Sequence, residues 1–271
     1  LNKVSEFLNS EKSHKIFTPN PEMLVDAQKD DYFKEILNGG DLNICDGFGL
    51  SLVGSFRGRR TRKLSKPKSD ELQKTNVNQI TNSSKDPSHR SGSFRMTRIA
   101  GVDFMIDICA LAEKENKTVY FLGGGNEKVI SNLKFVIGNK FPSLKIAGAH
   151  IGYKLQVTSY KLQYDEEEND NILHNIIMSA PDILFVAFGH GKQEKWIHEN
   201  LKDLPSVKIA MGVGGSFDFI SGKVKRAPKF LQKLGLEWLY RLAIQPSRFH
   251  RIFKATFVFI YYFLKSVISN Q

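Results

Sequence analysis

Two kinds of apolar pattern alternate along this chain of 271 residues. Short apolar runs of the kind that form buried strands occur six times. They lie at residues 15–17, 42–45, 119–122, 145–147, 183–188 and 207–213. Stretches with helical spacing of apolar residues fall between them, near residues 21–37, 103–116, 127–140, 166–179 and 193–201. Strands and helices in alternation predict an α/β fold: a Rossmann-like, mostly parallel sheet with helices on both faces.

Residues 61–95 interrupt this pattern. They are rich in Lys, Ser, Asn and Arg and nearly free of apolar periodicity. Such a segment buries too little surface to offset the entropy of ordering it, so we expect a disordered basic insertion. The insertion falls within a predicted Rossmann-like domain of residues 1–222. Residues 223–271 differ in composition and are predicted to form an amphipathic, helical C-terminal appendage.

The start of the chain and its cysteines carry two further expectations. The first residue is Leu1, and no initiator methionine or signal-peptide pattern is visible, so we expect a clipped N-terminus. Cys45 and Cys109 lie far apart, outside any CxxC or Cys/His pattern. This spacing argues against a disulfide scaffold or a zinc site and fits a reducing compartment. Both cysteines are expected to be core residues.

Positive charge is concentrated in two segments of the chain. The net charge is +11, but residues 57–98 carry twelve basic against three acidic side chains, and residues 223–265 carry ten against one. The rest of the chain is therefore acidic, at −7. Charge distributed in this way is expected of two surfaces or tails that meet an anion.

The appendage interleaves its basic residues with aromatic and aliphatic ones. This mixture is typical of an interfacial helix that lies among anionic lipid headgroups. Residues 255–264 are apolar but fall short of the roughly twenty residues that a membrane span requires. We therefore expect an anchor on a membrane surface. A helical hairpin packed on the body or in a homo-oligomer is the alternative, and nucleic-acid binding is a smaller one.

Glycines and polar residues follow the predicted strands, at the carboxyl ends where α/β sheets bind ligands. The glycines at residues 123–125 would let backbone amides approach a pyrophosphate, although a tight turn explains them equally well. Neither GxGxxG nor a Walker ending is present, which disfavours dinucleotide and P-loop chemistry. Asp46 could present a carboxylate to a cleft, or could cap a helix or turn. Residues 189–194 offer either an anion-facing helix N-terminus or a charged turn.

Four consecutive acidic residues at 165–168 could suggest a metal site. Carboxylates at a helix start more often complement the helix dipole, and we favour that interpretation. No strand-end aspartate pair of the type that holds a metal with nucleotide phosphates is evident in the sequence. We expect a reaction that uses no metal and no cofactor.

Several longer motifs occur together and in one order. They are residues 18–22 (TPNPE), 46–49 (DGFG), 98–103 (RIAGVD), 121–124 (FLGG), 181–186 (PDILFV), 192–196 (KQEKW), 212–219 (GVGGSFDF), 222–228 (GKVKRAP) and 235–241 (GLEWLYR). On these motifs the chain resembles the WecG/TagA/CpsF glycosyltransferases, glycosyltransferase family 26, over nearly its whole length outside the insertion. The order of several long motifs makes the resemblance specific.

The resemblance implies an activity and a location. The expected reaction is the inverting transfer of N-acetylmannosamine, or a related sugar, from a UDP-sugar to undecaprenyl-diphosphate-linked N-acetylglucosamine. Such an enzyme would serve cell-surface polysaccharide or teichoic acid synthesis. It would be cytoplasmic and peripheral on the inner face of the plasma membrane. Its partners would be the donor, the lipid-linked acceptor and the anionic membrane, with no nucleic acid.

The resemblance also implies roles for particular residues. Asp46 would be the general base that takes the proton from the acceptor hydroxyl, while Thr18 and Gln193 would position donor and acceptor groups. Arginines of the appendage would complete the site after docking at the membrane, because guanidinium groups can stabilise a diphosphate leaving group without a metal. By position they are Arg241, Arg248 and Arg251. The substrate-binding residues would be Asn20, Gly123, Gly124, Tyr153, Lys192, Gly214, Gly215 and Asp218.

Three departures from the family pattern stand out. Only the later part of the helix that usually precedes Thr18 is present, the loop before Lys192 contains His190 and Gly191 instead of proline, and the basic insertion is not a family feature. The alternative function is a non-catalytic or degenerate member that binds anionic membrane or nucleic acid. Salt-sensitive nucleic-acid binding without UDP-sugar affinity would distinguish it.

Overall fold

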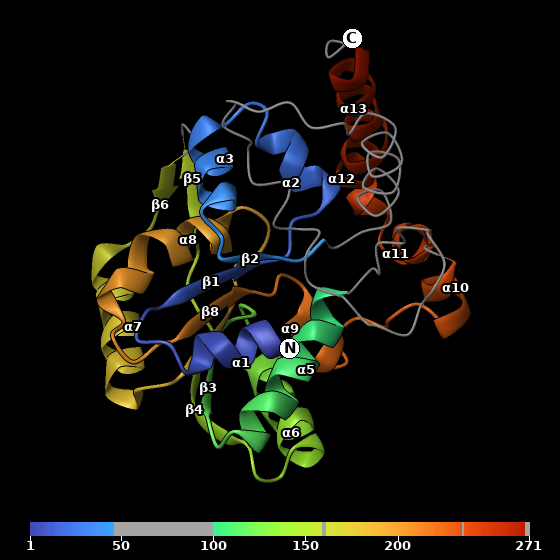
Figure 1. Ribbon diagram of the computed structural model, residues 1–271. Helices are drawn as coiled ribbons and strands as arrows, with labels where there is room; N and C mark the ends of the chain where they lie inside the picture. Colours follow the sequence, from blue (N-terminus) through green and yellow to red (C-terminus); the bar gives the residue numbers. More distant parts are fainter. Residues whose placement is uncertain (46–99, 159–160, 235, 269–271) are drawn as a thin grey trace, which may run out of the picture. The chain divides into compact units, whose positions relative to one another are not determined.

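A computed structural model of the protein describes residues 1–45, 100–158, 161–234 and 236–268 (Figure 1). These residues belong to two units. The first unit contains residues 1–18, 30–42 and 101–226, and the second contains residues 19–29, 43–100 and 227–271. Asp46 and the predicted insertion at residues 61–95 lie outside the described residues.

Six strands form the main sheet, in the order β2-β1-β8-β7-β3-β4. Their bounds are His14–Phe17 (β1), Leu42–Asn43 (β2), Thr118–Gly123 (β3), Lys145–His150 (β4), Ile183–Ala187 (β7) and Ile209–Gly212 (β8). The pairings of β1 with β8, β8 with β7, β7 with β3 and β3 with β4 are all parallel. Strands β3, β7 and β8 are almost fully buried, which confirms the α/β prediction made from their apolar runs.

Helices lie on both faces of this sheet (Figure 1). Helices α5, α6 and α9 pack together on one face, and α3 packs against α8 on the other, where α7 also lies. Their bounds are Asp31–Asn38 (α3), Gly101–Lys114 (α5), Glu127–Lys140 (α6), Glu166–Ser179 (α7), Lys192–Asn200 (α8) and Ser216–Ile220 (α9), with α1 (Asn2–Leu8) before β1. Helices α6 and α7 have the predicted bounds because Asn126 and Asp165 cap their first turns.

Several predicted strands and helices begin or end a few residues from the expected positions, and two features were not predicted at all. The helical stretch predicted near residues 21–37 is two helices, α2 (Pro21–Asp26) and α3, because the carboxylate of Asp30 accepts the Phe33 N–H at 2.9 Å and starts a new helix. An antiparallel hairpin of β5 (Gln156–Thr158) and β6 (Lys161–Gln163) was not predicted. Its three-residue strands are too short to show alternation.

The second unit is mainly helical in its described part. Besides α2, it contains α10 (Lys229–Lys233), α11 (Glu237–Ile244), the 3₁₀ turn η3 (Pro246–Arg248), α12 (Phe249–Phe253), the π-helical turn η4 (Lys254–Val258) and α13 (Phe259–Ile268). Val25 of α2 and Phe259 of α13 are the centre of a small apolar core. Among the described residues, no helix is long and apolar enough to cross a membrane.

The two cysteines occupy different environments. Cys109 is fully buried as predicted, and burial raises the pKa of its thiol to about 12. Cys45 is only partly buried, and it packs against the Val25–Phe259 core of the second unit. The prediction that Cys45 is a core residue is therefore confirmed only in part.

Candidate active site

The glycine loop after β3 is shaped by close backbone packing. Gly123, Gly124 and Gly125 all have positive φ, at 111°, 87° and 61°. A Cβ on Gly123 would lie 2.6 Å from the carbonyl oxygen of Ala187, at the end of β7. The amides of Gly124 and Gly125 donate to the carbonyls of Ala187 and Ile151 at 3.2 and 3.0 Å. These amides hold the strand ends together, so the loop serves the fold as well as any ligand.

Three of the predicted site residues meet at the end of β8. The Thr18 hydroxyl donates to the carbonyl of Gly212 at 3.3 Å, and the Gln193 side-chain oxygen accepts the Gly214 N–H at 2.9 Å. Gln193 is 3% exposed, and a Cβ on Gly212 would approach its side-chain nitrogen to 2.8 Å. These contacts connect the ends of β1 and β8 with the start of α8. We call Thr18, Gln193, Gly212 and Gly214 the strand-end joint.

Glu194 follows Gln193 in the sequence and contacts it, but it was not predicted as a site residue. Its side chain is fully buried, and its Oε1 accepts a hydrogen bond from the Gln193 side-chain nitrogen at 2.8 Å. Burial is the main cause that raises the pKa of the Glu194 carboxyl, against a smaller lowering by Gln193. The signal in the sequence was its position inside the KQEKW motif, directly after Gln193.

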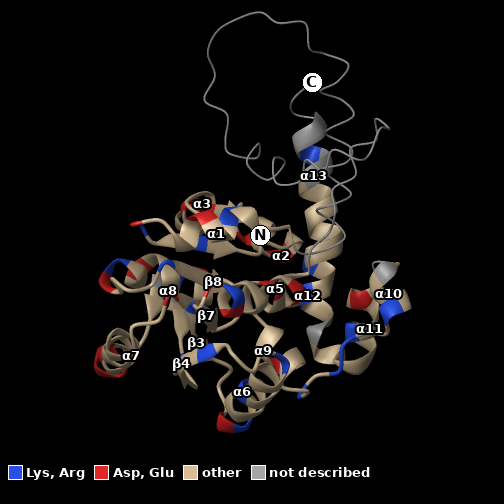
Figure 2. Ribbon diagram, turned by 60° about the horizontal axis from the view of Figure 1, so that its bottom comes forward, with Lys and Arg blue, Asp and Glu red and all other residues tan. Residues whose placement is uncertain are grey.

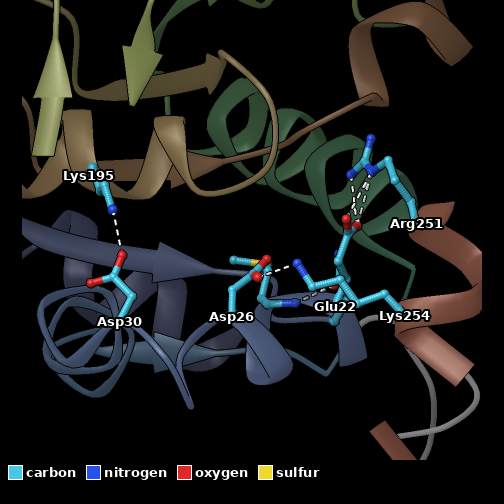
Figure 3. Close-up of polar contacts among 8 residues, drawn as sticks. Glu22, Asp26, Asp30, Lys195, Arg251 and Lys254 are labelled. Carbon is cyan, nitrogen blue, oxygen red and sulfur yellow. Dashed lines mark hydrogen bonds and ion pairs between the residues drawn. The ribbon is translucent and has the colours of Figure 1, made fainter. Parts of the chain in front are cut away.

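A buried ion pair fixes α8 against α3. The Lys195 ammonium lies 2.8 Å from the Asp30 carboxylate, and their side chains are only 4% and 9% exposed (Figure 3). The same ammonium lies 5.5 Å from the ring centre of Phe33 and 5.8 Å from that of Tyr32. Because α8 also carries Gln193, this pair helps to fix the position of the strand-end joint.

Tyr153, predicted to line the UDP-sugar site, directs its hydroxyl into the protein. The hydroxyl donates to the Asn169 side-chain oxygen at 2.5 Å, and the Trp196 indole N–H lies 2.9 Å from that oxygen and 3.1 Å from the hydroxyl. Burial raises the pKa of Tyr153 well above its ordinary value. Its ring also contacts Phe188, at 5.6 Å between centroids. These contacts fix the orientation of Tyr153, and its predicted role at the UDP-sugar site stays a prediction.

Three other predicted residues are engaged in local contacts. Lys192 donates from its ammonium to the carbonyl of Leu155 at 2.6 Å, which ties the start of α8 to the loop before β5. Gly215 is the N-cap of α9, and Asp218 in the first turn of that helix pairs with Lys223 at 3.0 Å. The start of the predicted appendage is thereby attached to the first unit, where Arg226 also forms a two-point ion pair with Asp103 on α5.

The acidic residues 165–168 form a helix start. Asp165 caps α7 by accepting the Glu168 N–H at 3.1 Å, and the three glutamates fill its first turn, drawn red in Figure 2. This confirms the interpretation as a complement to the helix dipole. A cavity of about 680 Å³ lies beside α7 and is lined by four carboxylates, those of Glu166, Asp170, Glu199 and Asp203. None of the predicted site residues that the structure describes lines this cavity, and its acidic wall would repel a diphosphate.

The remaining predicted residues belong to the second unit. Asn20 caps α2, with its side-chain oxygen accepting the Met23 N–H at 3.0 Å. Arg241 lies in α11, and Arg248 lies in η3, where its side chain is outside the described residues. Arg251 in α12 makes three hydrogen bonds of 2.9–3.1 Å to the carboxylate of Glu22 (Figure 3). Glu22 belongs to the TPNPE motif but was not predicted as a site residue.

The parallel sheet, with a buried polar joint at its carboxyl ends, defines the class: a Rossmann-like α/β protein whose candidate site is at the strand ends. The chain matches the model of the glycosyl transferase WecG/TagA/CpsF family over residues 1–74 and 88–271. It belongs to that family and is a glycosyltransferase, which confirms the resemblance read from its motifs. The match omits only residues 75–87. The stretch outside the family pattern is therefore shorter than the predicted insertion at 61–95.

Similar proteins of established name are bacterial. One from Bacillus subtilis (strain 168) is 32% identical over 238 residues, covering 88% of this chain and 74% of the relative. One from Bacillus spizizenii is 28% identical over 246 residues, covering 91% and 77%. One from Staphylococcus aureus (strain NCTC 8325 / PS 47) is 25% identical over 268 residues, covering 98% and 86%. Each is named N-acetylglucosaminyldiphosphoundecaprenol N-acetyl-beta-D-mannosaminyltransferase.

Proposed function

We propose that this chain transfers N-acetylmannosamine from a UDP-sugar to N-acetylglucosamine linked to undecaprenyl diphosphate. The observation that carries the proposal is the shared name of relatives aligned over 88–98% of this chain. The buried strand-end joint supports it, because Thr18 and Gln193 are fixed at the edge of the sheet where such folds bind their ligands.

The chemistry proposed for the site needs one base and one cationic clamp. Asp46 takes the proton from the acceptor hydroxyl as its oxygen attacks the anomeric carbon of the donor sugar. The bond from that carbon to the UDP oxygen breaks on the opposite face, so the configuration inverts and UDP leaves with the electron pair. Arg241, Arg248 and Arg251 would balance the growing charge on the diphosphate without a metal.

Residues 223–271 are proposed to act as the appendage that docks on anionic lipid. Its α12–η4–α13 segment exposes large apolar side chains at helical spacing, including Phe249, Phe253 and Phe257, which are 55%, 46% and 63% exposed. The rings of Phe253 and Phe257 lie 5.0 Å apart, so the side chains form a continuous stripe, continued by Ile260 and Tyr261. Basic residues of the appendage are drawn blue in Figure 2. An exposed apolar stripe with nearby cations fits an interfacial helix at the inner face of the plasma membrane.

The test is release of UDP from UDP-N-acetylmannosamine in the presence of EDTA. The acceptor is diphosphate-linked N-acetylglucosamine on a polyprenyl chain, in vesicles that contain anionic lipid. The full chain is compared with a version that ends at Arg226. Turnover that survives EDTA and is lost on truncation supports metal-free catalysis completed by the appendage. A folded full chain that binds nucleic acid in a salt-sensitive way and releases no UDP with any amino-sugar donor would contradict the proposal.

A further inference from the structure

Arg251 is held by a partner that restricts how it can move. Its Nε and Nη2 donate to both carboxylate oxygens of Glu22, whereas its Nη1 takes no part in these bonds. The Glu22 side chain is only 12% exposed, against 47% for Arg251. A two-point bond of this kind fixes the plane of the guanidinium group as well as its position. Glu22 thus acts on Arg251 as a geometric restraint.

A second ion pair repeats the contact one helical turn further along. Asp26 lies four residues after Glu22 on α2, and it pairs with Lys254, three residues after Arg251 (Figure 3). Residues spaced by three or four positions lie on the same side of a helix. Two contacts separated by one turn on both helices define their register, which a single contact would leave free. We call the two pairs the α2 latch.

An apolar contact that includes Cys45 accompanies the α2 latch. Val25 is 1% exposed and Phe259 is 8% exposed, and the side chains packed against them include Cys45. Cys45 is the residue immediately before Asp46 in the sequence. Docking of the C-terminal helix on α2 therefore shields the side chain of Cys45.

The C-terminal helix changes from α-helical to π-helical geometry where it packs against α2. The π-helical turn η4 begins at Lys254, and it packs against α2. Such turns are rare within α-helices and frequently mark functional sites. Here the turn lies on the segment that carries both the contact face and the exposed aromatic stripe.

We propose that Glu22 and Asp26 are positioning residues that set the register of the C-terminal helix on α2 and orient Arg251 for its task. Only the last step rests on the proposed transferase function. The latch itself is a property of the chain that can be measured without any substrate.

Alkylation of Cys45 by a maleimide reports the latch directly. Cys109 is fully buried with a raised thiol pKa, so labelling of the native chain is expected at Cys45, whose partly buried side chain becomes more accessible when the C-terminal helix opens. The substitutions Asp26→Lys and Lys254→Asp each place like charges together, and each should speed the labelling of Cys45 by about three- to tenfold. The double variant restores an ion pair with reversed polarity and should return the rate to that of the native chain.

A matched control and a milder variant accompany the charge reversals. Lys265→Asp makes the same charge change at an exposed position on α13, and it should leave the labelling rate unchanged. If either reversal fails to fold by circular dichroism, Asp26→Asn replaces it, with a smaller acceleration in the same direction. Unchanged labelling in the folded single variants, or no recovery in the double variant, would overturn the latch.

Kinetics in vesicles test the orienting role of Glu22. Glu22→Gln removes the charge but keeps the shape, and it should lower kcat by about tenfold to a hundredfold with little change in the KM of the donor. In an Arg251→Lys background the same substitution should cost almost nothing more, because Glu22 acts through Arg251. Full additivity of the two losses would refute this role. A chain with no turnover at all, whose Cys45 still responds as expected, would retain the latch and reject the proposed function.

Discussion

The strand-end joint of the first unit and the α2 latch of the second are stabilised in different ways. Gln193, Glu194 and Lys195 are at most 3% exposed, and their polar groups bond to neighbours inside the protein. The pairs of the latch are partly exposed, with side-chain exposures of 12–47%. The first arrangement persists as long as the fold does. The second depends on ion pairs that salt and local opening can weaken.

This difference affects how readily each region can open. A buried joint is preorganised, so under the proposed function its groups would not have to reorganise during the reaction. A helix attached by two partly exposed ion pairs and a small apolar core can open at lower cost than a buried joint, while its exposed stripe remains available to a membrane. We infer that the strand-end joint stays closed as long as the first unit is folded, whereas the C-terminal helix of the second unit can leave α2 without global unfolding.

The largest effect is expected at Asp46. Asp46→Asn keeps the shape of the side chain but cannot take the proton from the hydroxyl of the acceptor sugar, so turnover should fall by about 10²- to 10⁴-fold. UDP release in vesicles measures the loss, and calorimetry should show that UDP still binds. Full turnover in this variant would show that Asp46 is not the base. The proposed reaction, on which the functional comparison of the two regions depends, would then lack a catalytic base.

The next effect concerns stability and separates the two kinds of ion pair. Lys195→Met leaves the buried carboxylate of Asp30 without its partner and should cost about 3–5 kcal/mol of unfolding free energy. Glu22→Gln, at the more exposed pair, should cost at most about 1 kcal/mol. Urea unfolding followed by circular dichroism gives both numbers. Equal losses would show that the two regions do not differ in the way described.

Membrane affinity should depend on the aromatic stripe. Phe257→Glu removes a 63% exposed ring from the stripe and adds a negative charge, so binding to anionic vesicles should weaken by about tenfold or more. Cosedimentation with vesicles measures the affinity. Phe135→Glu is the matched control, since Phe135 is 69% exposed on α6 in the first unit. Similar weakening by both substitutions would mean that the stripe has no special part in docking.

The smallest effect is a dependence of stability on pH. The pKa of the Glu194 carboxyl is raised by burial, so the folded state binds the proton more tightly than the unfolded state. Its stabilising contribution is therefore full below the unfolded pKa of about 4.3 and is lost as pH rises through the raised folded pKa. Glu194→Gln should raise Tm at pH 8 by a few degrees, as about 1 kcal/mol does in a domain of this size. A gain as large at pH 4 would contradict this cause.

Much of the architecture could be predicted from local pattern. Helices α6 and α7 fall at the predicted residues because their apolar spacing and their capping residues, Asn126 and Asp165, act within one or two turns. Sheet strands were recognised from runs long enough to be buried on both faces. The hairpin β5–β6 and the break between α2 and α3 were missed. Their signals, three-residue strands and a single capping Asp30, are too short to outweigh neighbouring patterns.

The sequence by itself determined the fold class, the family, and the placement of Thr18, Gln193 and the glycines at the ends of strands, because these follow from periodicity and from motifs read in order. Only the tertiary structure decided which polar groups meet. Arg251 and Glu22 are 229 positions apart in sequence, and nothing in either local segment names the other as its partner. The hydrogen bond from the Tyr153 hydroxyl to Asn169 likewise could not be predicted from the sequence. Pairing over such separations is set by the packing of whole elements, since a side chain bonds to whatever the fold brings within about 3 Å of it.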